Sequence, residues 1–126
     1  MIICIDFDGT VVDHRYPVIG PDVPFAVESL KELFKFKNNL ILFTMRSGYG
    51  LGEAISWFIS KDIPLYGIQY NPDQAKWSYS NKCYAQLYID DSAVGCPLIH
   101  PQGFNKPCVD WINVKKILKT KGCYDL

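Results

Sequence analysis

The 126-residue sequence has no excess charge of either sign, because Lys plus Arg and Asp plus Glu number 13 each. No overall electrostatic field therefore favours nucleic acid or a membrane surface, although local patches remain possible. The N-terminus has no basic segment, and Asp6 interrupts the first apolar run, which argues against a signal peptide and a membrane span. There is no repeat, low-complexity tract or linker. We therefore expect a single domain over residues 1–126.

The five cysteines are an odd number, widely spaced and without a C-x-x-C pair, and no histidine cluster accompanies them. This pattern argues against both a disulfide framework and a structural zinc site. Cys4 lies inside the first apolar run, where a thiol behaves as a small apolar group. We expect reduced thiols and a cytoplasmic protein.

Short apolar runs alternate with segments of helical periodicity, which is typical of an α/β fold with a parallel sheet. The runs that we interpret as strands span residues 2–5, 40–44, 65–68, 87–91 and 97–100. Helices are predicted from Pro24 to just before Asn38, after Gly52, in a short stretch around Lys82, and from an N-cap at Asp110 to Gly122. Residues 11–23, rich in Pro and Gly, form an irregular flap.

Three predicted strands are followed or ended by polar side chains. Asp6 and Asp8 follow the first strand, Thr44 ends the second, and Asp90 and Asp91 end the strand that begins at residue 87. The carboxyl ends of parallel strands lie at one edge of a sheet, so we expect these side chains to converge there. Carboxylates are hard oxygen ligands, and Mg²⁺ is commonly held by one or two of them together with a substrate phosphate. The pattern predicts a magnesium and phosphate site.

These motifs resemble those of the haloacid dehalogenase superfamily, which has Asp-x-Asp-Gly-Thr/Val first, then Thr/Ser, then Lys/Arg and finally paired acids. The matching segments here are DFDGT at 6–10, Thr44 within LILFTMR, a lysine, and IDD at 89–91. The resemblance spans almost the whole chain. It implies a three-layer Rossmann-like fold and a Mg²⁺-dependent phosphatase that acts on phosphomonoesters.

The resemblance also implies a role for each matched residue. Asp6 is expected to be the nucleophile that forms an aspartyl-phosphate, since a carboxylate of ordinary pKa is ionised at neutral pH. Asp8 is expected to be the general acid and base. Thr44 and the backbone N–H groups of Met45 and Arg46 would bind phosphoryl oxygens.

Further roles in the same scheme concern charge and metal binding. A lysine, which we assign to Lys82 with Lys76 as the alternative, would neutralise charge on the phosphoryl group. Mg²⁺ would be held by Asp6, Asp90 and the backbone carbonyl of Asp8, with Asp91 acting behind them or through water.

The spacing leaves no room for an inserted cap domain, because only about 30 residues separate the first motif from the second strand. An open site of this kind favours a large or macromolecular phosphorylated substrate, or a lid supplied by the flap at 11–23 or by another subunit of a homo-oligomer.

Other functions stay open at this stage. One is a phosphate- or nucleotide-binding module, or a regulatory subunit, that keeps the metal site without turnover. Another is a nucleic-acid end-processing phosphatase, which the lysines of the last helix permit and the neutral overall charge disfavours. A phosphoacceptor receiver domain is disfavoured, because there the acid pair follows the first strand rather than a late one.

Overall fold

A parallel sheet of four strands forms the centre of the protein, for which a computed structural model describes residues 1–125. The strands are β1 (Ile2–Ile5), β2 (Asn39–Leu42), β3 (Gly67–Ile68) and β4 (Leu87–Ile89), in the order β3-β2-β1-β4. In the register, Ile3 is paired with Leu40 on one side and with Leu87 on the other. The predicted α/β fold with a central parallel sheet is thus confirmed.

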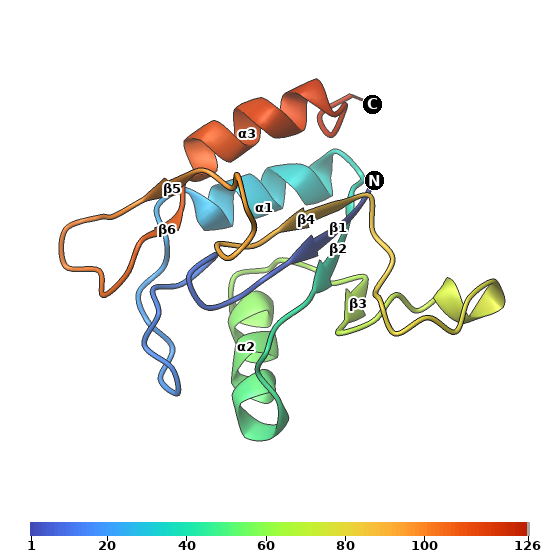
Figure 1. Ribbon diagram of the computed structural model, residues 1–126, viewed down its shortest axis with the longest axis horizontal. Coiled ribbons are helices and arrows are strands. Elements are labelled where there is room, and N and C mark those ends of the chain that lie inside the picture. Colours follow the sequence, from blue (N-terminus) through green and yellow to red (C-terminus); the bar gives the residue numbers. More distant parts are fainter. Residues whose placement is uncertain (126) are drawn as a thin grey trace.

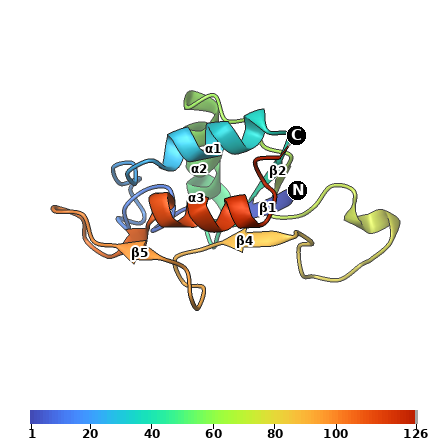
Figure 2. The same ribbon diagram turned by 90° about the horizontal axis from the view of Figure 1, so that it is seen from above.

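Helices cover both faces of this sheet and make a three-layer structure (Figure 1, Figure 2). Helices α1 (Ala26–Lys35) and α3 (Trp111–Thr120) lie on one face, and α2 (Gly48–Ser60) lies on the other. The buried apolar residues of α1 and α3 follow helical periodicity; they are Ala26, Leu30 and Leu33 in α1 and Trp111, Val114 and Leu118 in α3. The cap of α3 also agrees with the sequence, since the side chain of Asp110 accepts a hydrogen bond from the Asn113 N–H.

The segment between β3 and β4 differs from the sequence prediction. The expected helical stretch around Lys82 is wrong, because the helical residues of this segment are a single 3₁₀ turn, η1 (Gln74–Lys76). The Gln74 side chain explains the difference. Its Nε2 donates to the carbonyl oxygens of Ser80 and Lys82, and its Oε1 accepts from the Tyr84 N–H. The loop therefore satisfies its backbone groups without helix formation.

A small hairpin, β5 (Leu98–Ile99) with β6 (Cys108–Val109), lies at the edge of the sheet where β1 and β4 end (Figure 1). The strand predicted at 97–100 is therefore present, but it belongs to this separate antiparallel pair. α2 also begins earlier than expected, at Gly48. Residues 1–125 contain no cap domain, as the motif spacing predicted.

All five cysteines are free, and the Sγ atoms of Cys4 and Cys83 lie 3.6 Å apart in the interior. Among residues 1–125, every helix is too short or too polar to cross a bilayer.

Candidate metal and phosphate site

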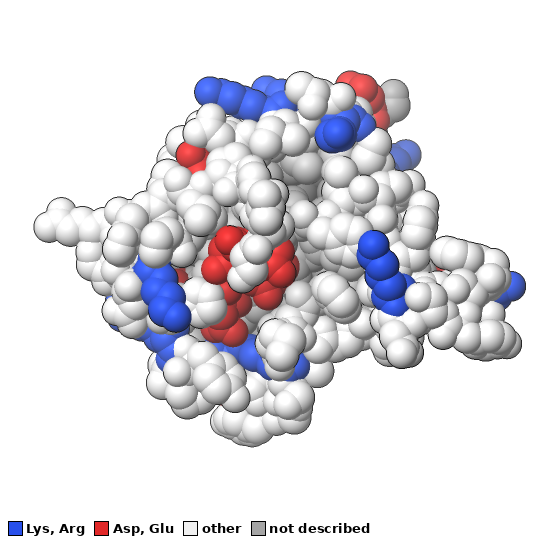
Figure 3. Space-filling view, in the orientation of Figure 1, with Lys and Arg blue, Asp and Glu red and all other residues white. Residues whose placement is uncertain are grey.

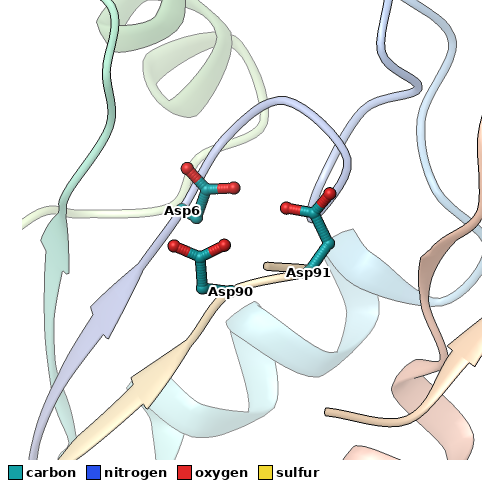
Figure 4. A group of neighbouring side chains, drawn as sticks. All are labelled: Asp6, Asp90 and Asp91. Carbon is teal, nitrogen blue, oxygen red and sulfur yellow. The ribbon is translucent and has the colours of Figure 1, made fainter. Parts of the chain in front are cut away.

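Three carboxylates meet where β1 and β4 end, as the convergence of strand ends predicted. Asp6 follows β1, and Asp90 and Asp91 follow β4; each offers an oxygen within 4.8 Å of the others (Figure 4). The pairing of the two strands continues to this point, because the Asp6 N–H donates to the Ile89 carbonyl oxygen at 3.0 Å. The sheet therefore holds the nucleophile candidate beside the paired acids.

The turn after β1 positions two of these carboxylates through Thr10, a buried residue of the DFDGT motif. Thr10 Oγ1 donates to Asp6 Oδ2 at 3.0 Å and accepts from the Asp91 N–H at 3.2 Å. Gly9 makes the approach possible, since its φ is +85° and a Cβ there would overlap the Asp91 carboxylate. Helix α3 supports the same turn, because Trp111 Nε1 donates to the Thr10 carbonyl oxygen at 2.8 Å.

The electrostatics of this carboxylate group suit a divalent cation. Burial, followed by the charge of Asp90, raises the pKa of Asp6 from its ordinary value of 3.8 to about 8. Burial raises the pKa of Asp90 as well. Without a cation the protein therefore holds a proton at the Asp6 carboxyl at neutral pH. A divalent cation would displace this proton and supply positive charge in its place. Carboxylate oxygens are ligands that Mg²⁺ prefers, so the donor set fits Mg²⁺.

This proton uptake predicts how Mg²⁺ and pH affect stability. The Asp6 carboxyl loses its proton near pH 3.8 in the unfolded protein, whereas its pKa in the folded protein is about 8. The folded state therefore binds more protons at pH values between these two. In metal-free buffer the contribution of Asp6 to stability is then fully present below pH 4 and is lost as the pH rises to 8. Mg²⁺ must displace the proton at low pH, so it should raise the melting temperature more at pH 8 than at pH 5.

Thermal unfolding at both pH values, with and without Mg²⁺, checks this prediction. The Asp6→Asn variant is the matched comparison, because it has no proton to exchange at this position. In the variant the shift caused by Mg²⁺ should be small at both values. Equal shifts in the variant and in the native protein would show that the cation binds elsewhere.

Asp8 lies in the same pocket but is held differently from the other acids. Both of its carboxylate oxygens accept hydrogen bonds from Arg46, at 2.7 Å from Nε and 2.9 Å from Nη2. The Arg46 side chain is 1% exposed, and its guanidinium lies over the rings of Phe7 and Tyr16 at 5.2 and 5.1 Å from their centroids. A bidentate pair of this kind requires an ionised Asp8.

The loop after β2 presents Thr44 toward the pocket, and part of its expected phosphate-binding surface is already used. The Arg46 N–H donates to Thr44 Oγ1 at 3.1 Å, so it is not directed at a ligand as expected. The Thr44 hydroxyl proton and the Met45 N–H have no acceptor within residues 1–125 and are available as hydrogen-bond donors to a ligand.

Gln69 holds this loop in place, and the sequence did not point to it. Its Oε1 accepts from the Thr44 N–H at 2.8 Å, and its Nε2 donates to the carbonyl oxygens of Thr44 and Arg46. Gln69 has a φ of 66°, a conformation that costs energy for a residue with a Cβ. It directly follows β3, a strand of only two residues. The sequence offered one signal for Gln69, a polar residue directly after a strand. This signal is weak because β3 has only two residues.

The structure does not bring Lys82 or Lys76 to the pocket. Lys82 is exposed with its Nζ 5.6 Å from the centroid of the Tyr88 ring, and Lys76 pairs with Asp73. The segment that carries both lysines runs from β3 to the start of β4, whereas the carboxylates follow the ends of β1 and β4 (Figure 1). The order of motifs along the chain carries no information about which end of the strand the lysine reaches.

Replacement of either lysine should therefore have little effect on a reaction in this pocket. We expect Lys82→Ala and Lys76→Ala to keep kcat/KM within about twofold of the native value, because exposed side chains far from a site rarely matter. Steady-state phosphate release measures the effect. A loss of a hundredfold in either variant would mean that the segment between β3 and β4 folds over the site during turnover.

The pocket around these groups has a volume of about 500 Å³. It is lined by all the predicted site residues except Lys82, together with His14, Tyr16 and Ser92. His14 from the flap lies against the acids, with Nε2 3.2 Å from Asp91 Oδ2. Figure 3 shows acidic side chains gathered near the centre of one face, with basic side chains around them. The arrangement provides cation ligands, hydroxyl and N–H donors and an ionised carboxylate within one cavity.

The comparisons with known proteins found one kind of match. No model of a known protein family matches the chain, and no curated protein matches it. The fold is similar to the solved structure of a conserved protein coded by a locus from Bacteroides thetaiotaomicron, with a TM-score of 0.79. The two sequences are 40% identical over 96% of this chain and 91% of the other.

Proposed function

We propose that this chain, which belongs to the same family as the Bacteroides thetaiotaomicron protein, is a Mg²⁺-dependent phosphomonoester hydrolase of the haloacid dehalogenase type. The observation that supports this most strongly is the meeting of Asp6, Asp90 and Asp91 at the sheet edge, beside the Thr44 loop. Phosphoryl transfer to an aspartate requires carboxylate ligands for a cation and hydrogen-bond donors for the phosphoryl oxygens, and one pocket offers both.

Asp6 is the nucleophile of the proposed reaction. One of its oxygens attacks phosphorus, the bond from phosphorus to the leaving oxygen breaks, and an aspartyl-phosphate forms. Water then attacks the same phosphorus, the bond to Asp6 breaks, and inorganic phosphate is released. Thr10, which hydrogen-bonds Asp6 Oδ2, leaves Oδ1 available for the attack.

Asp8 transfers protons in both halves of this reaction. In the second half it accepts a proton from the attacking water, and the ionised state held by Arg46 is the form that this step needs. In the first half it donates a proton to the leaving oxygen. Asp8 must therefore take up a proton and release at least one Arg46 contact before that step.

The remaining groups hold the phosphoryl oxygens. The Thr44 hydroxyl and the Met45 N–H donate to them, and Gln69 fixes the loop on which both are carried. When bound by Asp6, Asp90 and Asp91, Mg²⁺ supplies positive charge that keeps Asp6 ionised and offsets the charge of the phosphoryl group.

A phosphate-release screen tests the proposal. The purified protein is incubated with Mg²⁺ and a panel of sugar phosphates, nucleotides and oligonucleotides that carry a terminal phosphate. We expect Mg²⁺-dependent release from at least one class and none after chelation with EDTA. Release that is unaffected by EDTA would contradict the proposed site.

A second candidate is a phosphate-binding module without turnover. Two observations favour it: both oxygens of Asp8 are engaged by Arg46, and no lysine lines the pocket among residues 1–125. The same panel separates the two candidates. Mg²⁺-dependent binding of inorganic phosphate or a phosphomonoester, without release from any member of the panel, would identify the binding module.

A further inference from the structure

An aromatic side chain stands at the opening of the pocket in an exposed position. Tyr16 of the flap and Met45 of the Thr44 loop both line the pocket, and they are 66% and 97% exposed. Single exposed apolar side chains are ordinary on a protein surface, but two together at a charged cavity are a feature of ligand sites.

Hydrogen bonds to other segments hold the backbone of the flap on both sides of Tyr16. On its N-terminal side, Arg15 Nη2 donates to the Gly103 carbonyl oxygen at 2.9 Å, and the His14 carbonyl oxygen accepts from Asn105 Nδ2 at 3.2 Å. Buried Asp13 strengthens this attachment, since its Oδ2 accepts from Arg15 Nε and from the Asn105 N–H.

On the C-terminal side of Tyr16, Arg46 holds the backbone of the flap. Its Nη1 donates to the Pro17 carbonyl oxygen and its Nη2 to that of Val18, both at 3.2 Å. The same guanidinium lies 5.1 Å from the centroid of the Tyr16 ring. A cation beneath a ring contributes to fixing its orientation, so the exposed ring is preorganised.

The rest of the pocket offers little for recognition of a polyhydroxylated group. The nitrogens of Arg46 already donate to Asp8 and to flap carbonyls, which leaves His14 and Ser92 as the polar side chains outside the metal and phosphate groups. A volume of about 500 Å³ nevertheless exceeds what a phosphoryl group fills and lies in the range of sites for larger small molecules. Such a lining favours a leaving group that makes mainly apolar and aromatic contacts.

We propose that Tyr16 is a stacking platform for a planar ring, so that the substrates are phosphomonoesters whose leaving group carries an aromatic or heteroaromatic ring, as in nucleotides. This rests on the proposed phosphatase function, because the phosphoryl group must occupy the site beside Asp6. A flat ring stacks on a tyrosine whatever its edge chemistry, which favours a class of rings over a single compound.

The test compares a nucleoside 5′-monophosphate with ribose 5-phosphate, which share the reacting ester and differ in the base. In the native protein, kcat/KM should be about tenfold higher for the nucleotide, the size expected of one stacking contact. Tyr16→Phe should keep this preference and Tyr16→Ala should lose most of it. The matched control is Tyr79→Ala, an equally large change at a 93% exposed tyrosine far from the pocket, which should alter neither rate.

Two results would overturn the inference. One is a preference for the nucleotide that persists in Tyr16→Ala. The other is an equal loss for both substrates in that variant, which would mean that Tyr16 acts only by holding Arg46. Phenyl phosphate and a 5′-phosphorylated trinucleotide are tested as further substrates in the same assay. They show whether the preferred substrate is a small aryl ester or free nucleotide, or the end of a nucleic acid.

Failure of the proposed function would be recognised separately. If no member of this set is hydrolysed, the phosphatase proposal fails, and equilibrium binding of the nucleotide and of ribose 5-phosphate in the presence of Mg²⁺ still tests the platform. We expect the nucleotide to bind more tightly to the native protein and to Tyr16→Phe, but not to Tyr16→Ala. Equal affinities of the two ligands for the native protein would refute the stacking role.

Discussion

Asp6→Asn should lower kcat by at least about a thousandfold, since removal of a catalytic nucleophile commonly costs this much or more. An amide nitrogen and oxygen replace the two carboxylate oxygens, so the attack on phosphorus and one cation ligand are lost together. The fold should remain intact because the amide keeps the shape of the side chain and an oxygen that can accept from Thr10.

Stability provides an independent check on this variant. The Asp6 carboxyl, whose pKa is raised to about 8, destabilises the metal-free fold as it ionises, so the asparagine variant should be more stable than the native protein at pH 8. Asp62→Asn is the matched control, because Asp62 is exposed and follows α2 away from the pocket. It should change neither activity nor stability. An Asp6→Asn protein with native turnover would exclude Asp6 as the nucleophile.

Asp8→Asn should have the opposite effect on stability. The substitution leaves the buried guanidinium of Arg46 without its counter-charge, which typically costs about 3 kcal/mol of unfolding free energy. Turnover should fall by about a hundredfold to ten-thousandfold through loss of the proton donor and acceptor. Denaturant unfolding and steady-state phosphate release measure the two effects separately.

The double variant Asp8→Asn with Arg46→Met separates the two roles of the pair. An apolar side chain in place of the guanidinium removes the uncompensated charge, so part of the lost stability should return. Activity should not return, because the proton-transferring carboxylate is still missing. Recovery of activity together with stability would mean that Asp8 serves the fold alone.

The main framework of this fold could be predicted from local patterns in the sequence. β1 was predicted with the bounds observed, Asp6, Asp90 and Asp91 meet as expected, and α3 begins at its predicted cap. These features depend on apolar periodicity, on capping chemistry and on the rule that parallel strands end at one edge, all of which act over short stretches of chain.

The details that could not be predicted depend on long-range side-chain contacts. Asp8 was expected to converge with the other acids, but β1 ends at Ile5 and the chain turns at Gly9, so Asp8 pairs with Arg46 and stands apart from the group of three acids. Gln69 acts on a loop 25 positions earlier in the sequence. Lys82 could be placed near β4 but not at one end of it. Such outcomes depend on which partner lies opposite in space, and a single sequence carries no record of that.

Crystals grown with Mg²⁺ and beryllium fluoride, which forms a stable analogue of an aspartyl-phosphate, test the central claim most directly. We predict a beryllofluoride group bonded to a carboxylate oxygen of Asp6, with Mg²⁺ in contact with Asp6 and Asp90 and the fluorides within hydrogen-bond distance of Thr44 and the Met45 N–H. Density for the metal at another place, or an Asp6 that stays unmodified beside a bound Mg²⁺, would contradict the account.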